Sequence, residues 1–391
     1  MQDNVRMPAR MPAQRGLRTG LLVSFALVAL AAYSPGRTIE SWRVLEDIAA
    51  GAGPSTLKQV TPAPTRQAIT YRVEGRAYAG DLYRPGEAAK AALVLVPGAA
   101  RAGRDDPRLV AFATTLARAR FTVLVPDIEN LRALYVGPED VRSIADALRH
   151  LAARGELPGA PSLGLVAISY AVGPAILAAL EPDLRDRVRF VLSIGGYYDI
   201  EAMVTFFTTG RFRETPEEAW RFMAPNAYGK WIFLRANARR VEGARDRWLL
   251  TAMARRKLDD LEAPLDDLAA RLGPQGRSIH DLLANDDPDA VPALIAALPE
   301  AVRADMAALD LSRADLSRLG ARLILLHGRD DAIIPFTESL ALAAATPAAR
   351  VSLHVVDNLA HVDLGPGDLA DGLRLLTATY RMLALRDGRS R

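Results

Sequence analysis

Six apolar runs separated by helical patterns constrain the fold of this chain more than any other feature. Each run is seven or eight residues long and has few charged side chains, which is typical of strands buried on both faces of a mostly parallel sheet. The runs cover residues 91–98, 121–128, 162–169, 190–196, 321–328 and 350–357.

The segments between most of these runs have the spacing of amphipathic helices. They cover residues 106–119, 138–153, 171–181 and 336–345. A hairpin that turns near Glu74–Gly75 is expected before the first run, and a closing helix over 368–385 after the last. Alternating strands and helices predict an α/β fold with an open, doubly wound, mostly parallel sheet.

One interval breaks this alternation. Residues 200–317 show no clear strand pattern and contain a series of helical segments, so we interpret them as a helical cap inserted after the sixth core strand. The core is then divided into residues 67–199 and 318–391. The first half of the cap is rich in aromatic residues, which predict either a small core of its own or an apolar substrate pocket. They are Phe206, Phe207, Trp220, Phe222, Tyr228, Trp231, Phe233 and Trp248.

The first 34 residues have the pattern of a targeting segment. Four arginines precede "LLVSFALVALAA", and Ala29–Leu30–Ala31 fits a cleavage site. A helix over 20–34 would be about 22 Å long, shorter than the roughly 30 Å hydrocarbon core. We expect a signal peptide or a short membrane anchor, and an exported body that is periplasmic or anchored outside the cytoplasm. Residues 35–66, which hold four prolines, are predicted to be a linker.

Charge and composition argue against several kinds of partner. The chain has 49 basic and 46 acidic residues. Four of the basic and one of the acidic residues lie in residues 1–31, so the remainder has 45 of each and no basic surface for a nucleic acid is expected. There is no cysteine, and the five histidines form no metal-ligand motif. We therefore expect neither a metal nor an organic cofactor.

Three polar residues follow three different strands of the predicted sheet. Ser169 lies in "VAISYAVG", between a strand and a helix, with small residues two positions away on each side. Asp331 lies in "GRDDAIIP" and His361 in "DNLAHVD". Because ligands bind at the carboxyl ends of such strands, this order predicts a nucleophile, an acid and a base at one site. A serine in this position can also simply cap the helix that follows.

These motifs make the chain similar to the α/β-hydrolase superfamily, over residues 67–199 and 318–388. "AISYA" resembles the G-x-S-x-G elbow with alanines in place of both glycines, and "GRDDAIIP" resembles the acid loop, which picks Asp331 over Asp330. The resemblance implies catalysis by Ser169, Asp331 and His361. It also implies an oxyanion hole from the backbone N–H groups of Ala99 and Tyr170, since "VLVPGAA" occupies the place of the oxyanion loop.

Several alternatives remain open. Asp199, after the sixth strand, is a rival for the acid. The resemblance implies a serine hydrolase that cleaves carboxylic esters. The aromatic residues of the cap favour an apolar ester or acyl compound as substrate, and the N-terminal segment predicts association with a membrane. An acyltransferase, a thioesterase or a peptidase would use the same triad. The alternative outside the enzymes is a non-catalytic, membrane-tethered binding protein of the same fold.

Overall fold

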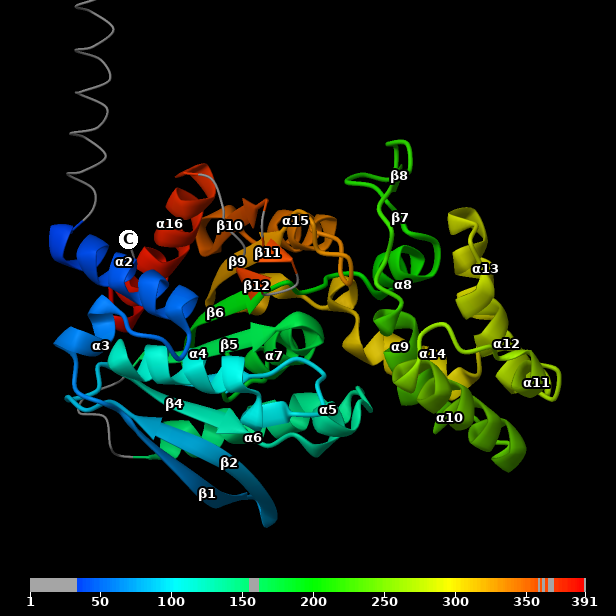
Figure 1. The fold of residues 1–391 in the computed structure, drawn as a ribbon, viewed down its shortest axis with the longest axis horizontal. Helices are drawn as coiled ribbons and strands as arrows, with labels where there is room; N and C mark the ends of the chain where they lie inside the picture. The colour runs from blue at the N-terminus through cyan, green and yellow to red at the C-terminus, as the bar shows by residue number, and fades with distance from the viewer. Residues whose placement is uncertain (1–33, 155–161, 358, 361–362, 365–368, 390–391) are drawn as a thin grey trace, which may run out of the picture.

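The computed structural model describes residues 34–154, 162–357, 359–360, 363–364 and 369–389. Its centre is an eight-stranded sheet in the order β1-β2-β4-β3-β5-β6-β9-β10, in which only β2 runs opposite to the other seven. This confirms the predicted α/β class and the mostly parallel sheet (Figure 1). The strands are β1 Thr65–Val73, β2 Arg76–Arg84, β3 Ala91–Val96, β4 Phe121–Pro126, β5 Ser162–Ile168, β6 Val188–Ile194, β9 Arg322–Gly328 and β10 Val351–Val356.

Helices cover both faces of the sheet, because the inner strands present apolar side chains on both sides. One face packs against α6 (Glu139–Ala153), α7 (Val172–Ala179) and α15 (Thr337–Ala345). The other packs against α4 (Pro107–Arg118) and α16 (Leu369–Arg386). Every residue of β3 and of β4 is buried, as the apolar runs indicate. The short α5 (Glu129–Ala133) follows β4.

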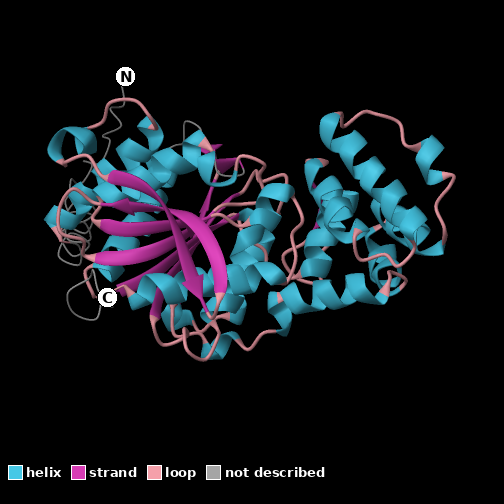
Figure 2. Cartoon of the chain, turned by 90° about the horizontal axis from the view of Figure 1, so that it is seen from below, coloured by secondary structure: helices cyan, strands magenta, loops and turns pink. Residues whose placement is uncertain are grey.

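The chain between β6 and β9 forms a separate helical body beside the sheet (Figures 1 and 2). It has its own apolar cluster, which includes Val204, Leu249 and Ile279. One short strand pair, β7 (Arg211–Phe212) with β8 (Arg221–Phe222), interrupts the helices, so the expectation of no strand here is wrong at that point. The helices are α8 Ile200–Thr209, α9 Tyr228–Ala238, α10 Ala244–Asp259, α11 Asp266–Ala269, α12 Pro274–Ala284, α13 Val291–Ala296 and α14 Glu300–Leu309.

The predicted linker over 35–66 is corrected by the structure. Pro35–Ala50 form helix α2 and Thr56–Val60 form α3, while β1 already begins at Thr65. Pro35 is compatible with α2 because it lies in the first helical turn, where a backbone N–H has no partner to lose. Val44 of α2 is fully buried against the core. The prolines therefore mark the ends of helices rather than an extended connection.

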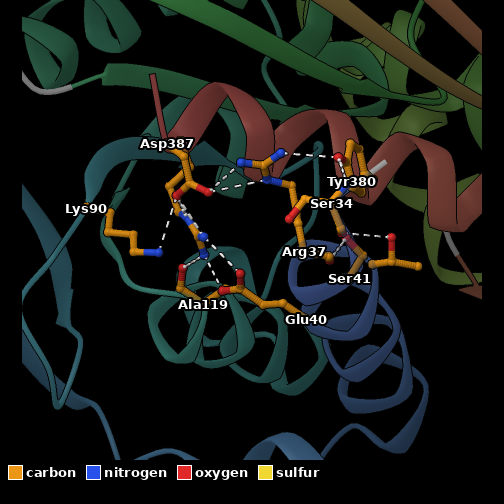
Figure 3. A network of polar contacts seen from close by, with 10 residues as sticks. Ser34, Arg37, Glu40, Ser41, Lys90, Ala119, Tyr380 and Asp387 are labelled. Atoms are coloured by element: carbon orange, nitrogen blue, oxygen red, sulfur yellow. Dashed lines mark hydrogen bonds and ion pairs between the residues drawn. The ribbon is translucent and has the colours of Figure 1, made fainter. Parts of the chain in front are cut away.

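Polar contacts fix α2 to α16, although the two helices lie near opposite ends of the chain (Figure 3). The Arg37 guanidinium donates to Asp387 Oδ2 at 3.0 Å and to the Tyr380 hydroxyl at 3.2 Å. The backbone N–H of Ser34 donates to the same hydroxyl at 2.8 Å. Residues 34–50 are thus part of the folded body.

The predicted targeting segment, residues 1–33, lies outside the described residues. In the part of the chain that is described, none of the helices combines the length and the apolar character that crossing a bilayer requires.

Candidate active site

Ser169 occupies a sharp turn between β5 and α7. Its φ angle is +57°, in the left-handed region that side chains other than glycine rarely adopt. A single 3₁₀ turn, Ser169–Ala171, leads directly into α7. Ala167 and Ala171, two positions away on each side, are both fully buried, so small residues are needed there. The backbone of a non-glycine residue in this conformation is strained, and strained residues are frequent at functional sites.

Close packing behind the turn explains the glycine at 173. A Cβ atom on Gly173 would lie 2.0 Å from the Tyr197 hydroxyl oxygen, so no larger residue fits. The buried Tyr197 donates this hydroxyl to the carbonyl oxygen of Leu309, the last residue of α14, at 3.0 Å. The start of α7 is therefore packed against a side chain that is hydrogen-bonded to the cap.

The loop after β3 lies against the serine turn. A Cβ atom on Gly98 would be 3.4 Å from Ser169 Cβ, which puts this loop in contact with the turn. Gly98, Ala99, Ser169 and Tyr170 all line one cavity. Tyr170 directly follows the serine in the first turn before α7, where backbone N–H groups have no helical partner. The two predicted oxyanion donors, Ala99 and Tyr170, are therefore brought to the cavity that Ser169 lines.

Asp331 follows β9 and is fully buried. Its Oδ1 atom accepts hydrogen bonds from the N–H groups of Ile333 at 2.8 Å and Ile334 at 3.1 Å, which fixes the orientation of the carboxylate. A Cβ atom on Gly195 would lie 3.1 Å from Oδ2, and Gly195 has a φ of +62°. The loop after β6 thus approaches the carboxylate closely only because residue 195 is glycine.

The side chain of His327, in β9, contacts the loop that carries Asp331. Its Nε2 donates to the carbonyl oxygen of Ile334 at 2.9 Å and lies 3.5 Å from Asp331 Oδ2. Its Nδ1 is 2.7 Å from Ser339 Oγ, on α15. Because His327 is completely buried with both ring nitrogens engaged, it shapes the loop around Asp331.

The rival acid, Asp199, has a different environment. Its Oδ1 accepts a hydrogen bond from the N–H of Ala202 at 3.1 Å and caps α8. The N–H groups of Tyr198 and Asp199 donate to Oε2 of the buried Glu338 carboxyl group at 2.9 and 2.8 Å. Burial raises the pKa of Glu338 to about 8. Asp199 therefore serves as the N-terminal cap of α8.

His361, the predicted base, lies outside the described residues. It falls in the chain between the two-residue strands β11 (Leu359–Ala360) and β12 (Asp363–Leu364), which pair with each other. His354 lies within β10 and is buried, which lowers its pKa to about 4.

A large cavity of about 910 Å³ opens at Ser169. The acid loop reaches it through Asp330, Ala332 and Ile333. Apolar side chains from the cap and from the helices on one face of the sheet supply most of its walls. The carboxyl ends of parallel strands, where this cavity lies, are the expected place for a ligand site. Among the described residues, no group of acidic and histidine side chains could hold a metal ion.

The strand order, with only the second strand reversed, and the left-handed serine after β5 decide the fold. The chain has the α/β-hydrolase fold. No protein-family model matches the sequence, and a comparison with curated protein sequences finds no match. The resemblance found in the sequence is confirmed at the level of the fold.

Solved structures similar to this chain include three hydrolases. The 2,6-dihydroxy-pseudo-oxynicotine hydrolase is 14% identical with a TM-score of 0.47, over 84% of this chain and 70% of that chain. The dienelactone hydrolase of Anabaena variabilis is 14% identical with a TM-score of 0.42, and the match covers 82% of this chain and 98% of that chain. The rice cell wall degrading esterase LipA of Xanthomonas oryzae is 18% identical with a TM-score of 0.48, and the match covers 83% of this chain and 89% of that chain. Similarities this low concern the fold only.

The aromatic residues of the cap fall into several groups, and two of them, Phe207 and Phe233, belong to the apolar cluster of the cap itself. Phe207, Tyr228 and Phe233 line the cavity. Phe206 instead packs with Phe212 and Phe336 in a small separate cluster. Phe222 and Trp248 are exposed.

Asp140 is a residue near the site that sequence reasoning missed. It lies in the first turn of α6, is fully buried, and has an Oδ2 atom 3.3 Å from the Tyr170 hydroxyl. The N–H of Gly137 donates to the same oxygen at 3.1 Å. Burial raises the pKa of Asp140 to about 6. An acid in the first turn of a helix is usually exposed, so the sequence contains no signal for this contact.

Proposed function

We propose that this α/β-hydrolase chain is a serine hydrolase that cleaves apolar carboxylic esters through an acyl-enzyme on Ser169. The left-handed turn at Ser169, on the wall of a large apolar cavity, is the observation that carries the proposal. Such a turn raises the hydroxyl above the end of the sheet and costs stability, which an ordinary helix cap does not require.

The proposed reaction uses the predicted triad. Ser169 Oγ attacks the ester carbonyl carbon while His361 takes its proton, and the N–H groups of Ala99 and Tyr170 bind the oxyanion. The protonated His361 then gives its proton to the alcohol oxygen as the C–O bond breaks. Water attacks the acyl-enzyme in the same manner and regenerates Ser169. His361 enters this scheme from its position in the sequence alone.

Asp331 is proposed as the acid that orients His361. Its carboxylate is buried and fixed by two backbone N–H groups, and its neighbours in the loop line the cavity. A fixed, buried carboxylate can hold one imidazole tautomer and stabilise the imidazolium that forms. Asp199 is engaged at the start of α8, which favours Asp331.

The first test is hydrolysis of p-nitrophenyl acetate and butyrate by the wild type and by Ser169→Ala. We expect Ser169→Ala to lower kcat by at least about a thousandfold, because the nucleophile is lost. Ser143→Ala, which removes a hydroxyl on the surface of α6, is the matched control and should keep full activity. A fluorophosphonate probe should label the Ser169 peptide in the wild type. A folded Ser169→Ala protein as active as the wild type would refute the proposal.

The second test compares the two candidate acids in the same assay. Asp331→Asn should lower kcat by about a thousandfold to ten-thousandfold, because the imidazole loses its orienting charge. Asp199→Asn is a matched change, since asparagine caps a helix about as well as aspartate does, and kcat should fall by less than about tenfold. The reverse ranking would assign the acid to Asp199.

A further inference from the structure

The residues that line the cavity at Ser169 come from two groups of elements, and we treat the space beside each group as a compartment. One compartment lies under the cap, where Met203 and Phe207 of α8, Phe233 of α9 and Met306 of α14 line it. The other lies between α2, α4 and α16, and we call it the helix compartment. Its lining includes Leu45 and Ile48 of α2, Leu109 and Phe112 of α4, and Leu375 and Met382 of α16.

The neighbours of Ser169 place the serine between the two compartments. Ile168, just before it, lines the cavity and packs with an apolar cluster that includes residues of α2, α4, α16 and the sheet. Tyr170, just after it, lines the same cavity and packs with the cap cluster. The two substituents on a carbonyl carbon attacked by Ser169 therefore have an apolar space on each side.

The walls of the helix compartment suit an uncharged alkyl chain. The sheet contributes Leu192 and Ile194 of β6, which are nearly buried and also line the cavity. Among the described residues that line this compartment, the charged ones are Asp106 and Arg108. They are bonded to each other, with 3.2 Å between Arg108 Nη2 and Asp106 Oδ2. An ionised ligand group would find no unpaired opposite charge there, whereas a hydrocarbon chain would gain by leaving water.

We propose that the helix compartment binds a long alkyl chain of the ester, so that the natural substrate is a lipid-like ester rather than a short-chain one. This inference rests on the proposed function at Ser169. The N-terminal helix α2, which supplies Leu45 and Ile48, is then part of the substrate site. Each methylene that the compartment buries should raise kcat/KM by up to about fourfold.

The test fills the compartment and measures chain-length preference. Ala111 of α4 lines the cavity and is half-buried, so Ala111→Phe places a ring in the compartment. Ala344→Phe, on the exposed surface of α15, is the matched control. Two substrate series are used: p-nitrophenyl esters from acetate to laurate, and acetate esters of alcohols from ethanol to dodecanol.

We expect Ala111→Phe to lower the ratio of long-chain to short-chain kcat/KM by tenfold or more in one of the two series, while Ala344→Phe leaves both ratios unchanged. The responding series tells whether the acyl or the alcohol chain lies in the compartment. If circular dichroism shows that Ala111→Phe does not fold, Ile48→Trp replaces it. Phe112→Ala, which enlarges the compartment, should shift the preference to longer chains.

The failure of this inference differs from the failure of the proposed function. Unchanged ratios in both series for the filled variants, with acetate hydrolysis that still depends on Ser169, would overturn the helix compartment as the chain site. Hydrolysis of all esters that is equal in the wild type and in Ser169→Ala would instead refute the proposed function itself.

Discussion

The backbone of Ser169 shows how a single residue departs from what is locally favourable. Its left-handed conformation costs on the order of 1–2 kcal/mol relative to glycine. The surroundings impose it, because the strand before and the helix after the turn are both packed in the core. Sequence reasoning can identify the serine from its small neighbours. The positive φ angle itself follows from the path of the chain in three dimensions.

Glu338 allows a prediction of pH dependence at the scale of one residue. Burial raises its pKa to about 8, against an ordinary value near 4.3, and its negative neighbours Asp199 and Asp310 act in the same direction. The folded state thus keeps a proton that the unfolded state loses. Between these pKa values the free energy of unfolding should fall as the pH rises, by up to about 1.4 kcal/mol per pH unit.

Glu338→Gln should remove this contribution. A glutamine oxygen can still accept from the N–H groups of Tyr198 and Asp199, and it has no proton to lose. Urea unfolding at pH 5, 6.5 and 8 should show the variant gaining stability relative to the wild type as the pH rises. Glu217→Gln, at an exposed position in the cap, is the control. Parallel stability curves for the wild type and Glu338→Gln would contradict the prediction.

At the scale of elements, the sequence predicts best the strands that are buried on both faces of the sheet. The inner strands leave continuous apolar runs, so their number and order along the chain can be inferred. The α2 helix is missed, because the four prolines of residues 35–66 suggest a linker, and only contacts with other helices, α16 and α4 among them, show that the segment is folded. The pair β7–β8 is missed because two residues are too few to form a pattern. Which cap aromatics face the cavity depends on how the helices pack.

The same limit applies to the candidate site. Ser169 and Asp331 stand out because each follows a recognisable strand within a motif. Asp140 and Glu338 do not stand out, because acidic residues near the start of a helix are normally solvated. Their burial results from contacts with residues distant in the chain, such as Tyr170 and Tyr198. Motifs can therefore find the reacting groups, while the residues that support them need the structure.

At the scale of the whole molecule, polar contacts between α2 and the end of α16 join the two ends of the described chain (Figure 3). The Arg386 side chain is fully buried. Its guanidinium donates to both carboxylate oxygens of Glu40 in α2, to Asp387, and to the carbonyl oxygen of Ala119 at 2.7 Å. Because a buried cation is stable only when it is paired, α2 is expected to contribute to the stability of the entire core.

Glu40→Ala tests this role of α2. The change leaves Arg386 with Asp387 as its remaining acidic partner, and we expect the free energy of unfolding in urea to fall by about 2–4 kcal/mol. Trp42→Ala, on the exposed face of the same helix, is the control and should change stability by less than about 0.5 kcal/mol. The loss should weaken the contact of α2 with α16, and so open the helix compartment and reduce its preference for long chains. A Glu40→Ala protein as stable as the wild type would show that the Glu40–Arg386 pair contributes no net stability, and the position of α2 would then depend on its other contacts, such as those of Val44 and Arg37.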